Sequence, residues 1–352
     1  MPRSSSKLTI KKESVRKFLC QREGSGVKIV EFKKLGSGWH GTGYRIGYLV
    51  KGKEKKTVLR ILSPIGFSHD YSSDRGAVFL FQNKLSGRIP GHIRSIDVGG
   101  VTSKNDLVSV GDVEEFFQIV EVADGDPYMN DILRIAKDGK LSTGDIDKAV
   151  ALSDYLVKLH SVKFKGNAAV QRSLRLRHLR DAIGHGEMLM GVLDTYPDRL
   201  TWLSKETIAE VLRRAVSFNI RVRGTAFPLV RMHGDFHPGN IWFDSGRSFT
   251  LLDSSREEWG SAADDLTALS INYIWQAIDT TGSFQGPFKK LYDAFWGNYL
   301  KKTRDKTVEK LAPLFFAFRG AVVAHPVFYP DQSDSVRKKL FRFILRGLKG
   351  EK

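Results

Sequence analysis

The sequence predicts an α+β protein in which a small, mostly antiparallel β lobe is followed by a larger α-helical lobe. Short apolar runs with alternating character and glycine-rich connections fill the first third of the chain. From about residue 145 onward, apolar residues recur at helical spacing. A chain of 352 residues, 41% hydrophobic and 27% charged, is long and apolar enough to fold into two such lobes.

The N-terminal lobe is expected to combine strands with two helices, and to end near the turn-like sequence ADGDP at 123–127. The predicted lobes are therefore 1–123 and 124–352. Helices are predicted over 14–19 and 68–85, and strands over 27–35, 44–50, 56–62, 92–101 and 114–122.

The C-terminal lobe is expected to be helical except around one motif. Helices are predicted over 145–163 and 205–218 because their apolar residues share one face. After the motif, the segments 240–243 and 250–253 are expected to pair as a hairpin. The last segment is a basic amphipathic helix that is predicted to dock on this lobe through Phe341, Ile344, Leu345 and Leu348.

Composition limits the classes of function. The formal charge of +17 favours anionic partners such as nucleotides, phosphorylated metabolites, nucleic acid or acidic membrane surfaces. The single cysteine, Cys20, excludes an internal disulfide framework and a cysteine-built zinc site. The N-terminus lacks the apolar core of a signal peptide, and no uncharged stretch is long enough to span a bilayer, so a soluble cytoplasmic protein is expected.

The sequence GSGWHGTG at 36–43 contains a glycine pattern, G-x-G-x-x-G, formed by Gly36, Gly38 and Gly41. A dinucleotide-binding fold requires a helix after this pattern, whereas a strand follows it here. The segment is therefore predicted to be a hairpin that either brings the backbone of Gly36, Ser37, Gly38 and Gly41 against ATP phosphates or is simply rich in glycine. Trp39 and His40 at its tip either shield the phosphates or pack.

The third strand contains Arg60, which either pairs with phosphate oxygens in bidentate fashion or is an exposed strand residue of a basic protein. A phosphate-binding role would place it beside the same nucleotide as the glycine hairpin.

The sequence MHGDFHPGNIWF at 232–243 has two interpretations. His233, Asp235 and His237 alternate like the ligands of a metal-dependent hydrolase, but this leaves the downstream polar residues unexplained. Phosphoryl transfer instead needs one carboxylate to orient the acceptor hydroxyl, and an amide and a second carboxylate to hold Mg²⁺. Asp235, Asn240 and Asp253 offer that set, and the predicted hairpin would bring the last two side by side.

The sequence HGDFHPGN, followed by LLDSSREEWGSAADDL, resembles the aminoglycoside/choline phosphotransferase family, relatives of the protein kinases. The resemblance implies a two-lobed protein-kinase-like fold and an enzyme that uses ATP and Mg²⁺. It implies that Asp235 is the catalytic base and that Asn240 and Asp253 are magnesium ligands. It also implies that His233 is the structural histidine of the loop and that Asp265 braces that loop.

The resemblance extends to a hinge, VEVADG at 120–125, in which the Glu121 carbonyl and the Ala123 N–H would bind the adenine edge. Three departures stand beside it. Arg60 replaces the lysine of protein kinases, Asp253 is followed by Ser-Ser-Arg, and the N-lobe helix has no clear glutamate. Asp74 is the nearest candidate for that glutamate, and its alternative role is to cap the helix.

The implied activity is transfer of the ATP γ-phosphate to a hydroxyl of a small molecule. A protein of charge +17 repels a polycation, so a neutral or anionic acceptor is expected unless Glu257, Glu258 and Asp264 overcome that repulsion. The alternatives are an atypical protein kinase of the Rio kind and a kinase-like protein associated with nucleic acid.

Overall fold

The computed structural model describes residues 10–38, 41–63, 68–88, 90, 93–113, 115–116, 118, 120–254 and 257–350. Trp39 and His40 lie outside these residues. The chain divides into two compact units, Met1–Val120 and Glu121–Lys352, and each is described by itself. The boundary predicted after residue 123 lies close to this division.

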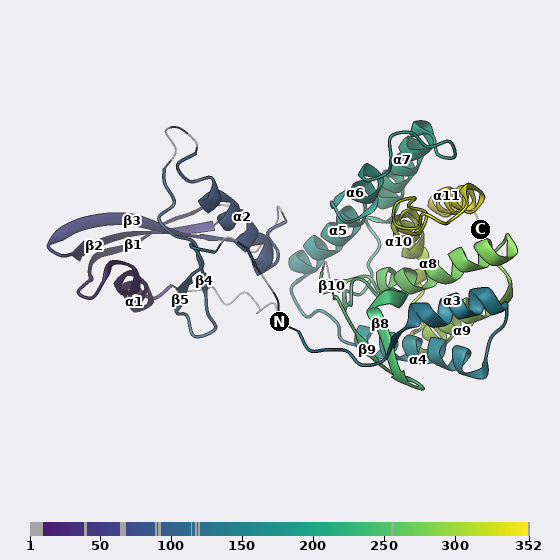
Figure 1. Cartoon of the computed structure of the whole chain (residues 1–352). Coiled ribbons are helices and arrows are strands. Elements are labelled where there is room, and N and C mark those ends of the chain that lie inside the picture. Colours follow the sequence, from purple (N-terminus) through teal and green to yellow (C-terminus); the bar gives the residue numbers. More distant parts are fainter. Residues whose placement is uncertain are drawn as a thin grey trace. The chain divides into compact units, whose positions relative to one another are not determined.

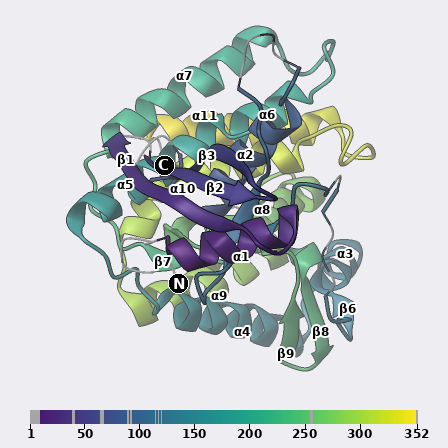
Figure 2. The same cartoon turned by 90° about the vertical axis from the view of Figure 1, so that its left-hand side faces the viewer.

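The N-terminal unit is built on an antiparallel sheet in the order β1–β2–β3. Along β2, every second side chain from Tyr44 to Val50 is buried, as the two-residue period of a strand requires. Val15 and Leu19 of α1 belong to the same core, and α1 lies along this face of the sheet (Figures 1 and 2). The elements are α1 (Lys12–Glu23), β1 (Lys28–Gly38), β2 (Gly41–Val50) and β3 (Lys53–Leu62).

The rest of this unit departs from the prediction. Of the strand expected over 92–101, only β4 (Gly99–Val101) forms, and it pairs with the unpredicted β5 (Leu107–Ser109). The strand expected over 114–122 is wrong for the described residues of that range, which are neither helix nor strand. Because those residues have no partner strand, apolar side chains such as Val122, 91% exposed, lie in solvent.

The second helix of this unit, α2 (Ser72–Lys84), begins with a capping interaction. The Asp74 carboxylate accepts a hydrogen bond from the Tyr71 backbone N–H at 2.8 Å. Asp74 therefore serves as the helix cap that the sequence offered as its alternative role.

The C-terminal unit surrounds one buried helix, α8 (Ala262–Thr281), which is buried from Ala262 to Ile278. Helices α3, α4, α9, α10 and α11 all contact it (Figure 1). The helical elements are α3 (Tyr128–Asp138), α4 (Thr143–His160), α5 (Ala168–Gly184), α6 (Leu189–Asp194), α7 (Lys205–Val222), the 3₁₀ turn η1 (Pro238–Asn240), α9 (Gly286–Thr303), α10 (Thr307–Val323) and α11 (Asp334–Lys349).

Two small sheets flank the predicted motif. One pairs β7 (Val230–Arg231) with β10 (Trp259–Gly260), and the other has the order β6–β8–β9. The predicted hairpin is confirmed, since β8 (Ile241–Ser245) and β9 (Ser248–Leu251) are antiparallel neighbours. The third strand, β6 (Asp126–Pro127), pairs with β8.

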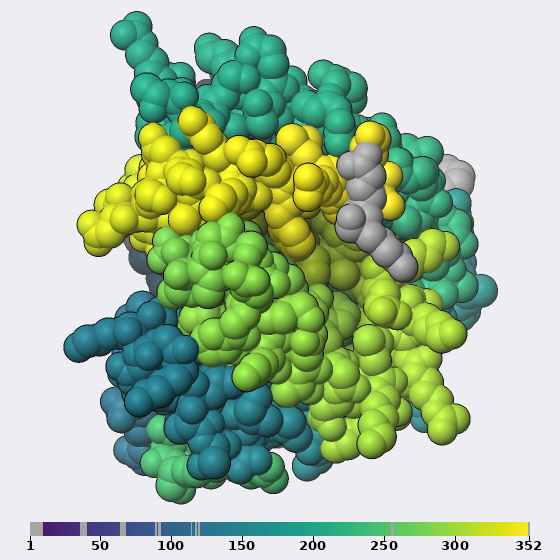
Figure 3. Space-filling view, turned by 90° about the vertical axis from the view of Figure 1, so that its right-hand side faces the viewer, coloured from purple at the N-terminus to yellow at the C-terminus, as the bar shows by residue number. Residues whose placement is uncertain are grey.

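The helices predicted over 145–163 and 205–218 are confirmed as α4 and α7. The predicted docking of the C-terminal helix is also confirmed, because α11 buries Phe341, Ile344 and Leu348. Its segment, in yellow, runs across the face shown in Figure 3. The predicted α+β fold class, a small antiparallel sheet followed by a helical region, is thus confirmed. Among the described residues, no helix has both the length and the apolar character needed to cross a bilayer.

Candidate active site

The predicted catalytic loop runs from the end of β7 to the start of β8. Gly234 has a left-handed backbone (φ +85°), a conformation that glycine adopts without the steric cost of a Cβ atom. Its N–H and that of His233 both point at one carboxylate, Asp265, in the first turns of α8. This loop is therefore fixed by main-chain hydrogen bonds to a helix that follows it in the chain.

Asp265 is fully buried and accepts three hydrogen bonds. The N–H groups of His233 and Gly234 lie 2.9 and 2.8 Å from its two oxygens, and His160 Nε2 lies 3.1 Å from Oδ2. Although burial alone would raise the pKa of Asp265, the hydrogen bond from His160 and the donation from His233 lower it below its usual value. The geometry fits the bracing role expected of Asp265.

The two histidines of the loop form hydrogen bonds within it. The Nδ1 atom of His233 accepts from the Asp235 N–H at 3.3 Å, and that of His237 accepts from the Gly239 N–H at 3.1 Å. Among the described residues, no cluster of three or more His, Cys, Asp or Glu side chains could hold a metal ion. The hydrolase interpretation, with three alternating ligands, therefore has no support.

Asp235 contacts a cation that the sequence did not point to. Arg319, in α10, donates from Nη1 to Asp235 Oδ1 at 2.5 Å, and from Nη2 to Asp264 Oδ1 at 2.9 Å. Arg319 also donates to the Gly234 carbonyl at 3.0 Å. Arg319 belongs to none of the sequence motifs. The sequence hint that relates to it is the pair of adjacent aspartates in DDL, one of which is its partner Asp264.

The backbone brings the two predicted magnesium ligands together. The Leu252 N–H donates to the Asn240 carbonyl at 2.9 Å, so Asp253 directly follows the residue paired with Asn240. The Asn240 amide nitrogen donates to the Asp235 carbonyl at 3.1 Å. Asp253 is exposed and has a left-handed backbone (φ +49°), which is uncommon outside glycine and often marks functional positions.

The acids just beyond Asp253 are already paired with cations. Glu257 lies 3.0 Å from Arg177 Nε and 3.0 Å from His178 Nδ1. Glu258 lies 3.1 Å from Arg231 Nη2. Burial would lower the pKa of His178, but its hydrogen bond with Glu257 raises it.

The predicted nucleotide residues of the N-terminal unit lie on its sheet. Gly36, Ser37 and Gly38 end β1 and Gly41 begins β2, with Ser37 opposite Thr42. Arg60 pairs with Gly43 across β2 and β3 and is exposed.

The same sheet face presents a shallow apolar area at Gly43. A Cβ atom built there would lie 3.6 Å from both Leu35 and Val58. Leu35, Gly43 and Val58 thus line one face of the sheet, next to Arg60 in the β2–β3 register.

The predicted site residues separate into two groups. Asp235, Asn240, Asp253, His233 and Asp265 lie together in the C-terminal unit, whereas Gly36, Ser37, Gly38, Gly41 and Arg60 lie on the sheet of the N-terminal unit. The hinge residues Glu121, exposed, and Ala123, half-buried, begin the C-terminal unit.

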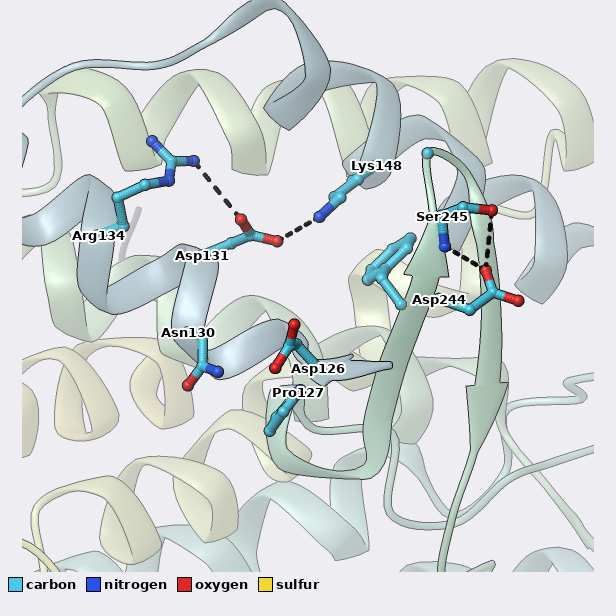
Figure 4. Close-up of a pocket in the computed structure, with 10 residues that line it drawn as sticks. Asp126, Pro127, Asn130, Asp131, Arg134, Lys148, Asp244 and Ser245 are labelled. Atoms are coloured by element: carbon cyan, nitrogen blue, oxygen red, sulfur yellow. Dashed lines mark hydrogen bonds and ion pairs between the residues drawn. The ribbon is translucent and has the colours of Figure 1, made fainter. Parts of the chain in front are cut away.

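A separate polar pocket of about 380 Å³ lies beside β6 and the β8–β9 turn (Figure 4). Within it, Asp131 lies 2.6 Å from Lys148 and 3.7 Å from Arg134. Asp131 is thus paired within the pocket, and none of the predicted site residues lines it.

The α+β fold and the His-x-Asp loop braced by Asp265 fit the class that the sequence resembles, that of the kinase-like phosphotransferases. Within that class, the model of the phosphotransferase enzyme family matches residues 138–304, which confirms the resemblance seen in the sequence. No curated protein matches the chain.

Several solved structures share part of the arrangement. Aminoglycoside phosphotransferase APH(4)-Ia, in a ternary complex with ADP and hygromycin B, is 13% identical, with 95% of this chain and 98% of that chain covered and a TM-score of 0.40. A Plasmodium vivax ethanolamine kinase is 14% identical, with 94% and 83% covered and a TM-score of 0.37. A glucosamine kinase in complex with glucosamine, ADP and inorganic phosphate is 15% identical, with 66% and 61% covered and a TM-score of 0.38. Similarity at this level carries no inference about the substrate.

Proposed function

We propose that this chain is an ATP-dependent phosphotransferase that moves the γ-phosphate of ATP to a hydroxyl of a small molecule. The observation that supports it is one cluster: Asp235 on a loop braced by Asp265, with Asn240 and Asp253 joined by backbone pairing. Phosphoryl transfer needs positioning and charge stabilisation more than covalent chemistry, and this cluster offers both.

Asp235 is the proposed base. It would accept the proton of the acceptor hydroxyl as the oxygen attacks the γ-phosphorus, and the bond to the β-phosphate oxygen would break. Its backbone is fixed by His233, and its neighbour Gly234 by Asp265, so the carboxylate has little positional freedom. General-base catalysis of this kind contributes about 10²- to 10⁴-fold to a rate.

Asn240 and Asp253 are the proposed holders of Mg²⁺. Their chemistry fits that ion, because one supplies an amide oxygen and the other a carboxylate, and hard cations prefer oxygen ligands. When bound, Mg²⁺ would neutralise charge on the phosphate oxygens. The hydrogen bond of Asn240 to the Asp235 carbonyl uses the amide nitrogen, which fixes the orientation of the amide oxygen.

The nucleotide is proposed to use the sheet of the N-terminal unit as well. The apolar area of Leu35, Gly43 and Val58 suits a flat adenine ring, and the absent side chain of Gly43 would allow close approach. Arg60, opposite Gly43, would pair with phosphate oxygens, with the backbone of Gly36, Ser37, Gly38 and Gly41. Glu121 and Ala123 would bind the adenine edge through their backbone.

The acceptor is proposed to be neutral or anionic. Glu257, Glu258 and Asp264 are the acids that could have attracted a polycation, and each has a cationic side chain within 3.1 Å. The protein also has a formal charge of +17. A cationic acceptor would therefore meet little uncompensated negative charge next to Asp253.

Calorimetry with ATP, in the presence and absence of Mg²⁺, tests the proposal directly. We expect binding that depends on Mg²⁺, followed by transfer of phosphate to at least one compound in a panel of sugars, hydroxy acids, nucleosides and amines. Absence of Mg²⁺-dependent ATP binding would reject the kinase proposal. Efficient phosphorylation of kanamycin-like polyamines alone would reject only the acceptor class.

A further inference from the structure

Arg319 belongs to the candidate site, although it lies in α10, beyond the segment 138–304 that matches the family. Its side chain is buried, with an exposed fraction of 4%. Its guanidinium makes three hydrogen bonds: to Asp235 Oδ1 at 2.5 Å, Asp264 Oδ1 at 2.9 Å and the Gly234 carbonyl at 3.0 Å. One cation thus connects the proposed base, its neighbouring peptide and α8.

The burial of this arginine requires its two carboxylate partners. A charge removed from water is strongly disfavoured unless it is paired and hydrogen-bonded, and Arg319 is both. Asp264 lies in the first turn of α8, where the helix dipole favours an anion, and it accepts from the same Nη2 atom that donates to the Gly234 carbonyl. Although burial lowers the pKa of Arg319, the charges of Asp264 and Asp235 raise it, so the group stays cationic.

We propose that Arg319 is the positioning residue of the catalytic base: it holds Oδ1 of Asp235 in one orientation. This inference rests on the proposed function of Asp235. Asp264 acts one step further away, by holding Arg319. A guanidinium is suited to this task because its rigid fork donates to several acceptors at once, whereas a lysine ammonium cannot reproduce that geometry.

Other titratable side chains also face Asp235 in the described part of the chain. His237 Nε2 lies 3.8 Å from Asp235 Oδ2, and His233 accepts the Asp235 backbone N–H. Burial, and then the charge of Asp235, raises the pKa of Tyr329. Of these groups, Arg319 makes the shortest contact with the Asp235 carboxylate.

The first measurement needs no activity. Asp235 can be followed in the full chain by NMR after labelling aspartate carboxyl carbons with ¹³C, its signal being the one lost in Asp235→Asn. Arg319→Met should change the ¹³C chemical shift of this carboxyl at neutral pH, because Oδ1 loses the hydrogen bond from the guanidinium. An unchanged carboxyl signal would overturn the proposal.

The second measurement is Mg²⁺-dependent ATP hydrolysis, in which water is the phosphate acceptor. Arg319→Met should lower kcat by about 10²-fold and Arg319→Lys by about 10-fold, while the KM for ATP stays within about 3-fold. A KM effect equal to the kcat effect would show that Arg319 serves nucleotide binding instead.

The controls separate the possible failures. Arg337 is the other arginine buried among the described residues, and it pairs with Asp334, so Arg337→Met should change neither the Asp235 carboxyl signal nor kcat. If Arg319→Met does not fold, Arg319→Lys and Asp264→Asn carry the same tests. If the wild-type chain binds no ATP, the proposed function fails, while the carboxyl signal still decides whether Arg319 holds Asp235.

Discussion

At the scale of single residues, the two aspartates of the candidate site have different surroundings. Asp235 is half-buried and contacts the buried Arg319, whereas Asp253 is exposed on a left-handed backbone after the β9 strand. A half-buried carboxylate beside a fixed cation suits proton acceptance in one orientation, and an exposed carboxylate suits an incoming metal ion. Their substitutions should therefore have separable effects.

The first prediction concerns these two positions. Asp235→Asn should reduce turnover by about 10²- to 10⁴-fold and leave the affinity for Mg²⁺–ATP near that of the wild type. Asp253→Ala should weaken Mg²⁺–ATP binding as well. Calorimetry and steady-state kinetics on both variants measure the two effects. An equal loss of nucleotide affinity in both would show that the assigned roles are wrong.

The second prediction concerns Asp265 and pH. Asp265→Asn should lower the free energy of unfolding by about 3 kcal/mol at neutral pH, because buried donors lose their charged acceptor. Since folding lowers the pKa of Asp265, its stabilisation exists above the unfolded value of about 3.9 and is lost as pH falls through the folded value.

The difference between wild type and Asp265→Asn should therefore shrink in acid, as urea denaturation at several pH values can check. Asp293→Asn is the matched control, since it removes an exposed carboxylate whose ion pair within the described part of the chain is with Lys289, four residues earlier in the helix. A difference that does not change with pH would contradict the pKa argument.

Residue-level patterns in the sequence indicated one group of candidate site residues. Asp235, Asn240 and Asp253 are close in sequence. The hairpin that connects the last two is local, so the turn-forming residues between its strands predict it. Arg319 could not be found this way, because its contact with Asp235 joins residues 84 positions apart and depends on how α10 packs on α8. The sequence shows the acids Glu257 and Glu258, but it could not show that they are paired, because their cationic partners lie on other elements.

At the scale of elements, a helix or strand predicted from the sequence forms where local residues favour it and a packing or pairing partner is present. The helices α4 and α7 combine a strong apolar period with a serine at the N-cap, so sequence and structure agree on them. The segment 114–122 is rich in the apolar and aromatic residues that strands favour, yet a strand forms only where a neighbour pairs with it, and its described residues have no such neighbour.

The third prediction concerns the start of α4. Asp145 is buried there, accepts the Ser142 N–H at 2.6 Å and pairs with Arg134 at 2.5 Å. Asp145→Ala should lower the free energy of unfolding by about 3 kcal/mol, since it removes a helix cap and leaves a cation without its partner.

Asp131→Ala is the comparison for that variant. Asp131 also contacts Arg134, at 3.7 Å, and Lys148, at 2.6 Å, but its carboxylate is more exposed than that of Asp145, so its loss should cost about 1 kcal/mol. Thermal and urea denaturation of both variants measure the difference. Equal losses would mean that the cap and its burial contribute nothing beyond a surface ion pair.

At the scale of the whole molecule, the chain combines a basic character with two separate cores. The C-terminal unit has its own buried helix α8, and the N-terminal unit has a core between α1 and its sheet. Both cores are local to their units, which is why the order of β and helical segments in the sequence predicted the α+β class.

The fourth prediction follows from charge. ATP affinity should fall by about 10-fold or more between 0.05 and 0.5 M salt, because a protein of charge +17 attracts the nucleotide over distances that salt screens. The affinity for an uncharged acceptor should change little over the same range. Calorimetry at four salt concentrations tests both. ATP binding that does not change with salt would contradict this prediction and would show that the nucleotide is recognised through short-range contacts alone.

The position of Arg319 has a consequence for how this activity can be lost. If Arg319 orients Asp235 as proposed, a mutation in α10 would abolish turnover while every residue between His233 and Asp253 stays intact, because Arg319 lies 84 residues after Asp235 in the chain. Such a protein would keep its catalytic loop and its nucleotide affinity. It would bind ATP without transferring its phosphate, and so lower the concentration of free ATP without turnover.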